Sequence, residues 1–564
     1  MSEISEASID LILPELIMIG GLIACILIPN LGDARMRIPL TNVRIPTLLG
    51  GTRFEVTRDP RIPNSIALIC FSSSLAISLF MLINSSAGDI GNVLRADSFS
   101  SLLAVIFASS LLLVSLASYH GLPPKPSAEA PSDGDSQEEE GAKIRSLYDN
   151  RRQADFYILL LTVGIGMTLM VKSTHLFMLF VCLELASLSS YVLVGFHKES
   201  EFGGEAGTKY FIVGSVASAA GIYGMSLLYL WNGDLSIESL ASSWEAMGAN
   251  TDPFAAIGVG LMLVAFGFKV GAAPFHLAIP DAYAGASSMV AGLLATASKA
   301  MGFVALMRIL LVVTLPESGE SVWFVVVAVI SVITMTWGNL AALSSENPKR
   351  IFAYSSVAHA GYMLAAVAVV GTGLGDAGTK ELIVTAIMFH LAILVLFKLG
   401  AFLVLSVIET KGESHRIESL HGLAHRDPII AGSMLVFVLS LAGVPPFSGF
   451  LSKLLMINGI VHATAGSGSL TSSFVFSWAG SVEIAFWLAF AVVINSALSL
   501  FYYLRIGLVM FFEAPDESEI DPAGAPLRFA IAICALLTLA LGIGPMSQTA
   551  LELVGDAALD LLSS

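Results

Sequence analysis

Long apolar runs separated by short polar stretches dominate this chain. A run of about 18 or more apolar residues can cross a bilayer as a helix, because the hydrocarbon core is about 30 Å thick. The pattern therefore predicts an all-α integral membrane protein with about 14 transmembrane helices. The candidate spans lie at residues 8–29, 64–85, 97–119, 155–172, 174–196, 209–231, 254–276, 286–313, 321–344, 350–371, 381–408, 429–462, 483–510 and 527–554.

Glycine and proline interrupt two of these spans. The seventh contains GFKVGAAPFH and the twelfth contains LAGVPPFSGF. Proline removes a backbone donor and breaks the hydrogen-bond ladder of a helix. Backbone groups that are freed at membrane depth must face protein or water. We therefore expect two broken helices, each beside a polar site near the middle of the membrane.

The two interruptions occupy the fourth position in two blocks of five spans, 155–313 and 321–510. Because five is an odd number, the second block enters the membrane from the opposite side, which is the inverted-topology repeat found in many transporters. These two blocks are the expected repeat units. Before them lie a three-helix region (1–119) and a polar, flexible cytoplasmic loop (120–154), and after them a C-terminal loop with the last helix (511–564).

Lysine and arginine in the loops predict the orientation. With the N-terminus outside, the inside loops hold 17 of these residues and the outside loops hold three, which are Arg95, Lys172 and Lys380. Cytoplasmic loops are the ones that concentrate positive charge, so we expect both termini outside. The start, MSEISEASID, lacks the basic region of a cleavable signal, so the first span should remain as a helix.

Composition supports a membrane protein and excludes other classes. Hydrophobic residues make up 55% and charged residues 13% of the chain, whereas soluble domains carry about 25% charged residues. The net charge of −16 comes largely from loops and indicates no nucleic-acid partner. The four cysteines all lie in apolar runs and form no CxxC pair, which argues against an iron–sulfur, zinc or disulfide framework. We therefore expect no cofactor site and no metal site in this chain.

Charged side chains inside the apolar spans are the strongest functional signal. A lysine at the centre of a membrane helix costs about 2.5–3.5 kcal/mol on insertion scales, so five ionisable residues in one chain predict a path that handles charge. The residues are Glu184, Lys269, Lys299, Lys398 and Lys453.

Lysine suits proton transfer in such a setting. Burial disfavours its charged form and a nearby carboxylate favours it, so a changing distance between Glu184 and Lys269 would switch that lysine between holding and releasing a proton. His276, His359 and His390 are candidate relay groups. The structural alternative is that the lysines bind Glu184 or freed carbonyl groups, and that the histidines are satisfied core residues.

Four ordered segments carry a resemblance to a known family. FGFKVGAAPFHLAIPDAYAGA, LLATASKAMGF, KRIFAYSSVAHAGYML and LAGVPPFSGFLSKLLM are similar to the antiporter-like membrane subunits of respiratory complex I, which are shared with Mrp-type sodium/proton antiporters. Within the family the chain most resembles subunit N of the bacterial NADH–quinone oxidoreductase. The resemblance implies a proton-translocating, non-redox subunit in the bacterial inner membrane. Partner subunits would hold NADH, flavin, iron–sulfur clusters and quinone.

The resemblance also implies roles for individual residues. Glu184 and Lys269 match the glutamate and lysine of the input half-channel, Lys299 matches the connecting lysine, and Lys453 matches the lysine of the output half. A subunit of a Mrp-type cation/proton antiporter or of a membrane-bound hydrogenase shares these motifs and is the alternative. A structural spacer that does not pump is a third possibility.

The eleventh span departs from the pattern of subunit N. It reads FHLAILVLFKLGAF, so that His390 and Lys398 lie eight residues apart, a little over two helical turns, and on roughly the same face. These two residues are more like subunits L and M. We expect Lys398 to line the interior and to extend the relay toward Lys453.

Overall fold

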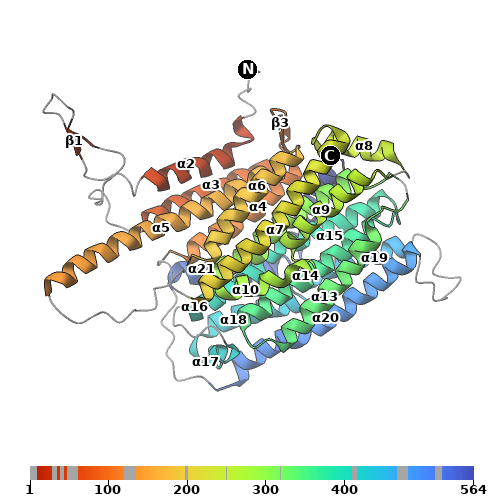
Figure 1. Cartoon of the computed structure of the whole chain (residues 1–564). Helices are drawn as coiled ribbons and strands as arrows, with labels where there is room; N and C mark the ends of the chain where they lie inside the picture. The colour runs from red at the N-terminus through yellow and green to blue at the C-terminus, as the bar shows by residue number, and fades with distance from the viewer. Residues whose placement is uncertain are drawn as a thin grey trace.

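The computed structural model of the chain describes residues 9–27, 35–37, 44–46, 61–119, 135–196, 201–248, 251–317, 319–409, 416–465, 480–514 and 524–563. Most of the predicted loop at 30–63 and the first part of the predicted loop at 120–154 lie outside these ranges. The described residues form a bundle of long, roughly parallel helices (Figure 1).

The N-terminal region contributes three apolar helices and two small hairpins. The helices are α2 (Leu13–Leu27), α3 (Ile62–Ile83) and α4 (Ser98–Ala117). In the hairpins, the antiparallel partners are β1 (Arg35–Arg37) with β2 (Arg44–Pro46), and β3 (Gly88–Ile90) with β4 (Leu94–Ala96).

The first predicted block is built of five spans, two of them composite. Its elements are α5 (Asp135–Lys172), α6 (Leu176–Val194), α7 (Glu201–Asn232), the short α8 (Ile237–Met247), α9 (Pro253–Val270), η2 (Phe275–Ala278), α10 (Ile279–Gly285), α11 (Ser288–Leu293), the π-turn η3 (Leu294–Ser298), α12 (Lys299–Met307) and the π-turn η4 (Arg308–Val313). The elements from α11 to η4 form one continuous span.

The second block also has five spans, and a bent helix pair follows it. Its elements are α13 (Phe324–Ser344), α14 (Pro348–Val370), α15 (Ala377–Leu394), the π-turn η5 (Val395–Leu399), α16 (Gly400–Glu409), η6 (Ile417–Leu420), α17 (Leu423–Arg426), α18 (Pro428–Ala442), α19 (Ser448–Ala465) and α20 (Ser481–Phe512). The pair is α21 (Ala525–Ala540) and α22 (Pro545–Ser563).

Helices occupy every predicted span, so the all-helical membrane fold is confirmed. Among the described residues, 11 helices are long and apolar enough to cross a membrane, and a bent pair would make 12. The first and twelfth predicted spans are the ones that fall short, because α2 and α18 have only 15 residues each. A straight crossing needs about 20.

Two helices differ from the sequence expectation in length or shape. The span within α5 is Gln153–Lys172, close to the predicted 155–172, but the helix itself begins at Asp135. The second part of the predicted loop is therefore helical, and its Glu-, Lys- and Arg-rich sequence favours that state. Figure 1 shows this part of α5 extending beyond the bundle. The last predicted span is not one helix, because α21 and α22 meet at 88°.

Both predicted breaks are present and have the same local form. Helix α9 ends at Gly271 and α18 ends at Gly443, with φ of +79° and +80°. Glycine adopts this left-handed conformation without steric cost. Proline follows within three residues in each case, at Pro274 and Pro446. The shared geometry fits the expectation that the two blocks repeat one design.

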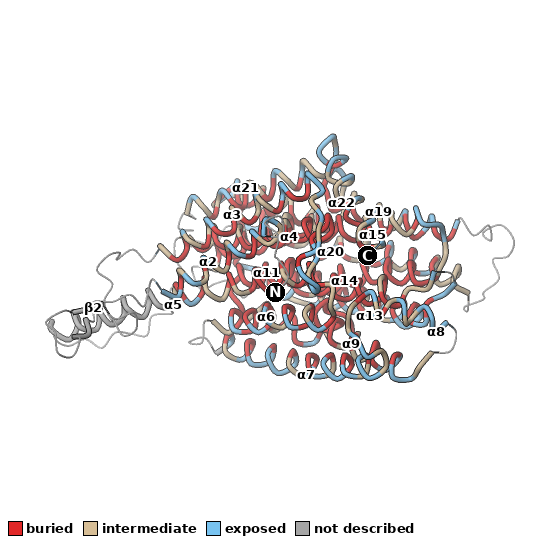
Figure 2. The backbone as a smooth tube through the Cα atoms, turned by 90° about the horizontal axis from the view of Figure 1, so that it is seen from above, coloured by how far each residue is buried: buried red, intermediate tan, exposed pale blue. Residues whose placement is uncertain are grey.

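Small residues allow the helices to approach closely. A Cβ atom on Gly361 of α14 would lie 2.5 Å from the backbone nitrogen of Met335 in α13, so the two backbones are in direct contact, as in other membrane helix pairs. Figure 2 shows that buried residues fill the middle of the bundle and exposed residues follow its periphery. The core is therefore continuous across both blocks.

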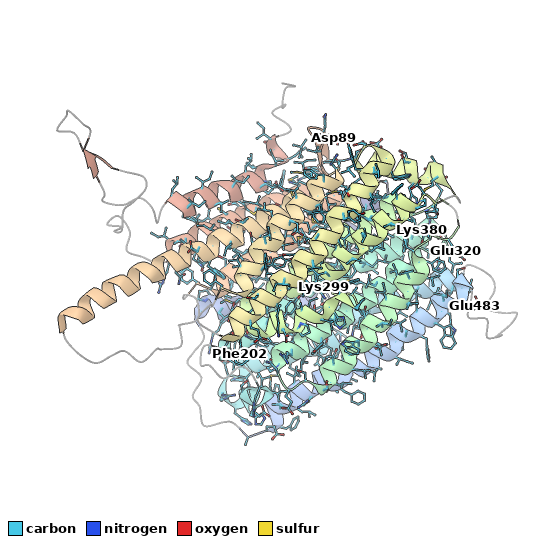
Figure 3. All side chains as sticks on the ribbon, viewed as in Figure 1. Asp89, Phe202, Lys299, Glu320, Lys380 and Glu483 are labelled. Carbon is cyan, nitrogen blue, oxygen red and sulfur yellow. The ribbon has the colours of Figure 1, made fainter. Side chains whose placement is uncertain are left out.

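The ends of the bundle follow the predicted alternation of loops. Figure 3 shows Asp89, Glu320, Lys380 and Glu483 at one end and Phe202 at the other. The predicted spans place Asp89, Glu320 and Lys380 in outside loops and Phe202 in an inside loop. Glu483 is the first residue of the predicted thirteenth span, at its outer end. We refer to these as the predicted outer end and the predicted inner end.

Candidate functional site

All four lysines of the predicted path are buried inside the bundle. Lys269, Lys299, Lys398 and Lys453 are 7%, 1%, 0% and 4% exposed, and Figure 3 shows Lys299 in the interior, between the two ends. None of the four faces lipid. Because an isolated ammonium group is costly in such surroundings, its hydrogen-bond partners decide what it can do.

Lys269 is bonded to a tyrosine rather than to the predicted glutamate. Its Nζ donates to Tyr191 Oη at 2.6 Å and lies 4.7 Å from the centre of the Tyr191 ring. Glu184 instead accepts a hydrogen bond from Ser218 at 2.8 Å, and no ion pair joins Glu184 to Lys269 within 4.0 Å in this structure. Tyr191 follows Glu184 by seven residues on α6, about two turns along the same face.

Lys299 lies against the break of the seventh span. Its Nζ donates to the backbone oxygen of Ser356 at 2.6 Å and lies 3.4 Å from where a Cβ on Gly271 would be. The missing side chain at Gly271 therefore gives the amine room. Through these contacts Lys299 links the seventh, eighth and tenth spans.

Lys453 has the matching position at the break of the twelfth span. Its Nζ donates to the backbone oxygens of Leu441 and Ala442 at 2.8 and 3.3 Å, and to Ser496 Oγ at 3.1 Å. It also lies 3.4 Å from the place of a Cβ on Gly443. A cation at the C-terminal carbonyl groups of a helix is favourable. Lys453 thus binds carbonyl groups that are freed at the helix break, as the structural alternative for the lysines expects. Such bonds do not exclude proton exchange.

A continuous hydrogen-bonded chain, here called the central network, runs from Lys398 into the second block. Lys398 Nζ donates to Ser355 Oγ at 2.6 Å, and Ser355 is hydrogen-bonded to the Tyr503 hydroxyl. Tyr503 Oη lies 3.3 Å from His359 Nε2. His359 Nδ1 lies 2.9 Å from His390 Nε2, and His390 Nδ1 lies 2.8 Å from Ser452 Oγ.

Every bridging member of the central network can both donate and accept. Hydroxyl groups and neutral imidazole rings have this property, so a proton bound at one end can be matched by release of another at the far end. The two ends lie beside the other lysines in sequence, because Ser355 precedes Ser356, the partner of Lys299, and Ser452 precedes Lys453. The hydrogen bonds of the central network thus extend from Lys398 to Ser452.

The relay histidines separate into two groups. His359 and His390 stack with ring centres 5.1 Å apart and belong to the central network. His276 is buried, but neither of its ring nitrogens has a hydrogen-bond partner, and its ring lies 6.1 Å from that of Trp337. The structure therefore joins two of the three predicted histidines to the lysines.

Sequence reasoning missed several polar partners. Tyr191, Tyr503 and Ser452 stand in apolar helices, where tyrosine and serine are unremarkable, and only their contacts give them a role. Lys172 was also predicted to lie in an outside loop. Lys172 is instead 1% exposed and forms a buried ion pair with Glu15 of α2 at 2.8 Å.

No group of three or more His, Cys, Asp or Glu residues that could hold a metal ion occurs in the ranges that the structure describes. All four cysteines are buried and unpaired.

A family described as NADH:quinone oxidoreductase/Mrp antiporter, transmembrane, matches residues 173–477, which include every lysine of the path. This chain belongs to that family. Members of this antiporter family that resemble it include NADH-quinone oxidoreductase subunit N of Trichlorobacter lovleyi, which is 36% identical over 408 residues, 71% of this chain and 77% of the relative.

Solved structures show the same fold. A chain of respiratory complex I from Thermus thermophilus superimposes with a TM-score of 0.68 at 27% identity, over 96% of this chain and 99% of that one. A chain of the Mrp complex from Dietzia sp. superimposes with a TM-score of 0.73 at 21% identity, over 99% and 97%. The complex I chain and the Mrp chain therefore share this antiporter-like fold. The relative from Trichlorobacter lovleyi, which is similar in sequence, is a subunit N.

Proposed function

We propose that this chain translocates protons across the bacterial inner membrane as a non-redox subunit of an NADH–quinone oxidoreductase. The observation that carries the proposal is the central network, an unbroken hydrogen-bonded chain from Lys398 to Ser452 in the buried core. A purely structural spacer has no need of a path in which each bridging group can exchange a proton.

In the proposed mechanism the lysines store protons and the central network connects them. Lys299 and Lys453 each lie at the break of a helix, where backbone oxygens stabilise a charged amine. Lys398 has a hydroxyl partner only, so loss of its proton leaves a single hydrogen bond to rearrange. Glu184 acts on Lys269 through Tyr191, and movement of that tyrosine changes how strongly the carboxylate favours the charged lysine.

The rest of the assembly follows from the same proposal. NADH, flavin, iron–sulfur clusters and quinone belong to partner subunits, in line with the name of the subunit N relative. Both termini face outside, as the distribution of lysine and arginine indicates. Quinone reduction in the partners then supplies the free energy that drives the lysines through their cycle.

The alternative is a subunit of a Mrp-type cation/proton antiporter or of a membrane-bound hydrogenase. The fold similarity to the Mrp complex supports it as far as architecture is concerned. It predicts transport that depends on sodium or another cation and does not require NADH oxidation.

Replacement of Lys398 by Met tests the proposal. Moving a charge against the membrane potential requires about 2.3 kcal/mol per 100 mV, so a broken relay should fail most clearly in energised membranes. The purified complex is reconstituted into vesicles, and NADH oxidation and proton uptake are measured together. We expect Lys398→Met to lower the number of protons moved per NADH, while Lys380→Met, at the predicted outer end, leaves it unchanged. Normal pumping by Lys398→Met under load would exclude Lys398 from the path.

A further inference from the structure

A buried ion pair links the two blocks at the predicted inner end. Lys349 Nζ and Glu409 Oε1 are 2.5 Å apart, and their side chains are 1% and 18% exposed. Lys349 lies at the start of α14 and Glu409 at the end of α16, so both belong to the second block. Neither residue is part of the central network. We call this pair the inner clamp.

Each member of the inner clamp also binds the backbone of the first block. Lys349 Nζ donates to the backbone oxygen of Ala286 at 2.9 Å, and the backbone nitrogen of Ser288 donates to Glu409 Oε2 at 2.7 Å. Ala286 and Ser288 flank the turn between α10 and α11. The intervening Ser287 makes no side-chain capping bond, so the acceptor at this helix start comes from the other block.

The two charges of the inner clamp interact favourably with the dipoles of the helices of the first block that they contact, and unfavourably with the dipoles of their own helices. A cation is unfavourable near a helix N-terminus and an anion near a C-terminus, yet Lys349 begins α14 and Glu409 ends α16. Lys349 lies instead at the end of α10 and Glu409 at the beginning of α11. The favourable interactions with helix ends are thus between the blocks, whereas the ion pair itself lies within the second block.

The three spans that meet at the inner clamp are the ones that carry the middle of the proton path. Lys299 follows Ser288 by 11 residues on one span, and Lys398 precedes Glu409 by 11 residues on another (299 − 288 and 409 − 398). Ser355 and Ser356, the partners of Lys398 and Lys299, lie about two turns from Lys349 on α14. A shift at the inner clamp would therefore displace each lysine relative to its own partner on α14.

We propose that Lys349 and Glu409 are positioning residues that hold the two blocks in the register needed for proton transfer between Lys299 and Lys398. This inference rests on the proposed function and extends it to a contact between the half-channels. When the pair is intact, the turn between α10 and α11 is held against α14 and α16. When it is broken, the buried charge that remains has no partner, and the inner end opens.

Glu409→Gln is the direct test, because glutamine keeps one oxygen acceptor for Ser288, while it removes the charge and replaces the oxygen that accepts from Lys349 by an NH2 group. We expect a several-fold lower number of protons per NADH in reconstituted vesicles, with normal assembly and normal NADH oxidation after addition of an uncoupler. The conservative Lys349→Arg should retain most of the pumping, since it keeps a cation there. Equal pumping by Glu409→Gln and the unmodified complex would overturn the proposal.

The adjacent residue provides a matched control. Arg350 forms an ion pair with Asp281 of α10 at 2.7 Å, and their side chains are 47% and 34% exposed. Exposed ion pairs contribute little, so Arg350→Gln should leave pumping unchanged. If Arg350→Gln and Glu409→Gln lower pumping equally, general loss of charge at this end explains the effect and the inner clamp has no special role.

A charge swap separates simple attraction from the backbone bonds. The double variant Lys349→Glu with Glu409→Lys restores opposite charges, but it places a carboxylate against the Ala286 oxygen and an ammonium group against the Ser288 nitrogen. We therefore expect no rescue of pumping. Full rescue would overturn the assignment of the inner clamp as a link between blocks.

A thiol reporter tests the inner clamp independently of pumping. Ala353 is fully buried and lies one turn from Lys349 on the same face of α14. In Ala353→Cys, a membrane-impermeant thiol reagent applied from the inside should label the cysteine faster when Glu409→Gln is also present. Unchanged labelling would show that the inner end stays closed. If NADH oxidation by the unmodified complex moves no protons, the proposed function fails, whereas this labelling still reports whether the inner clamp holds.

Discussion

At the residue scale, one hydroxyl group joins the two parts of the central network. Tyr503 contacts Ser355 on the side of Lys398 and His359 on the side of the stacked histidines. No other side-chain hydrogen bond that we observe among the described residues bridges Ser355 to His359. The lysines could thus be intact and still be disconnected if this hydroxyl were lost.

Tyr503→Phe should therefore uncouple the path without disturbing the packing. The phenylalanine ring fills the same buried space and removes only the oxygen. Groups that transfer protons typically contribute about 100-fold or more to a rate, so we expect proton uptake to fall by about 100-fold. The measurement is proton uptake per NADH oxidised in vesicles. Tyr223→Phe on the exposed face of α7 is the matched control and should behave as the unmodified chain.

At the element scale, an ion pair fastens the short first helix. Helix α2 has only 15 residues, and Glu15 in its first turn is bonded to Lys172 at the end of α5, which also donates to the backbone oxygen of Leu11. The pair is remote from the central network. We assign it to attachment of α2 rather than to proton transfer.

Lys172→Ala should accordingly lower stability more than proton coupling. Removal of one member of a buried pair costs about 3–5 kcal/mol, because the other charge stays buried without a partner. A thermal-unfolding or assembly measurement should show the loss, and the double variant with Glu15→Ala should lose less than the sum of the single variants. Lys209→Ala, which breaks exposed pairs with Glu205 and Asp281, should leave stability nearly unchanged.

The break of the twelfth span yields a second prediction for an element. Gly443 has φ of +80°, a conformation that costs a side-chain-bearing residue about 1–2 kcal/mol, and its missing Cβ leaves room for Lys453. Gly443→Ala should therefore displace the Lys453 amine and lower proton uptake. Gly432→Ala in α18, where a Cβ meets nothing within 4 Å, should have no such effect. Similar pumping by both variants would contradict this role for the break.

At the scale of the whole molecule, the chain crosses the bundle repeatedly from one end to the other. The orientation of the protein in the membrane is predicted from the lysine and arginine residues of its loops. Cysteines introduced at Ser2 and Ser136 should be labelled by an impermeant reagent from opposite sides, the first from outside and the second from inside. They belong to the N-terminus and to the region after three spans. Labelling of both from one side would refute the predicted topology.

The sequence by itself determined the membrane class, the spans and the lysines. Apolar length and the cost of burying charge are local properties, so Lys269, Lys299, Lys398 and Lys453 could be recognised without any contact. The breaks were visible for the same reason, because glycine and proline act on their own helix.

Only the tertiary structure decided which groups meet. Tyr503 lies 148 residues from Ser355, and Lys349 lies 60 residues from Glu409. Such pairs depend on how the helices pack and rotate, which hydropathy does not specify, and the same packing bonded Lys269 to Tyr191. The lysines are thus a property of the sequence, and the path that connects them is a property of the folded bundle, because a hydrogen bond requires atoms from different helices to lie within about 3 Å.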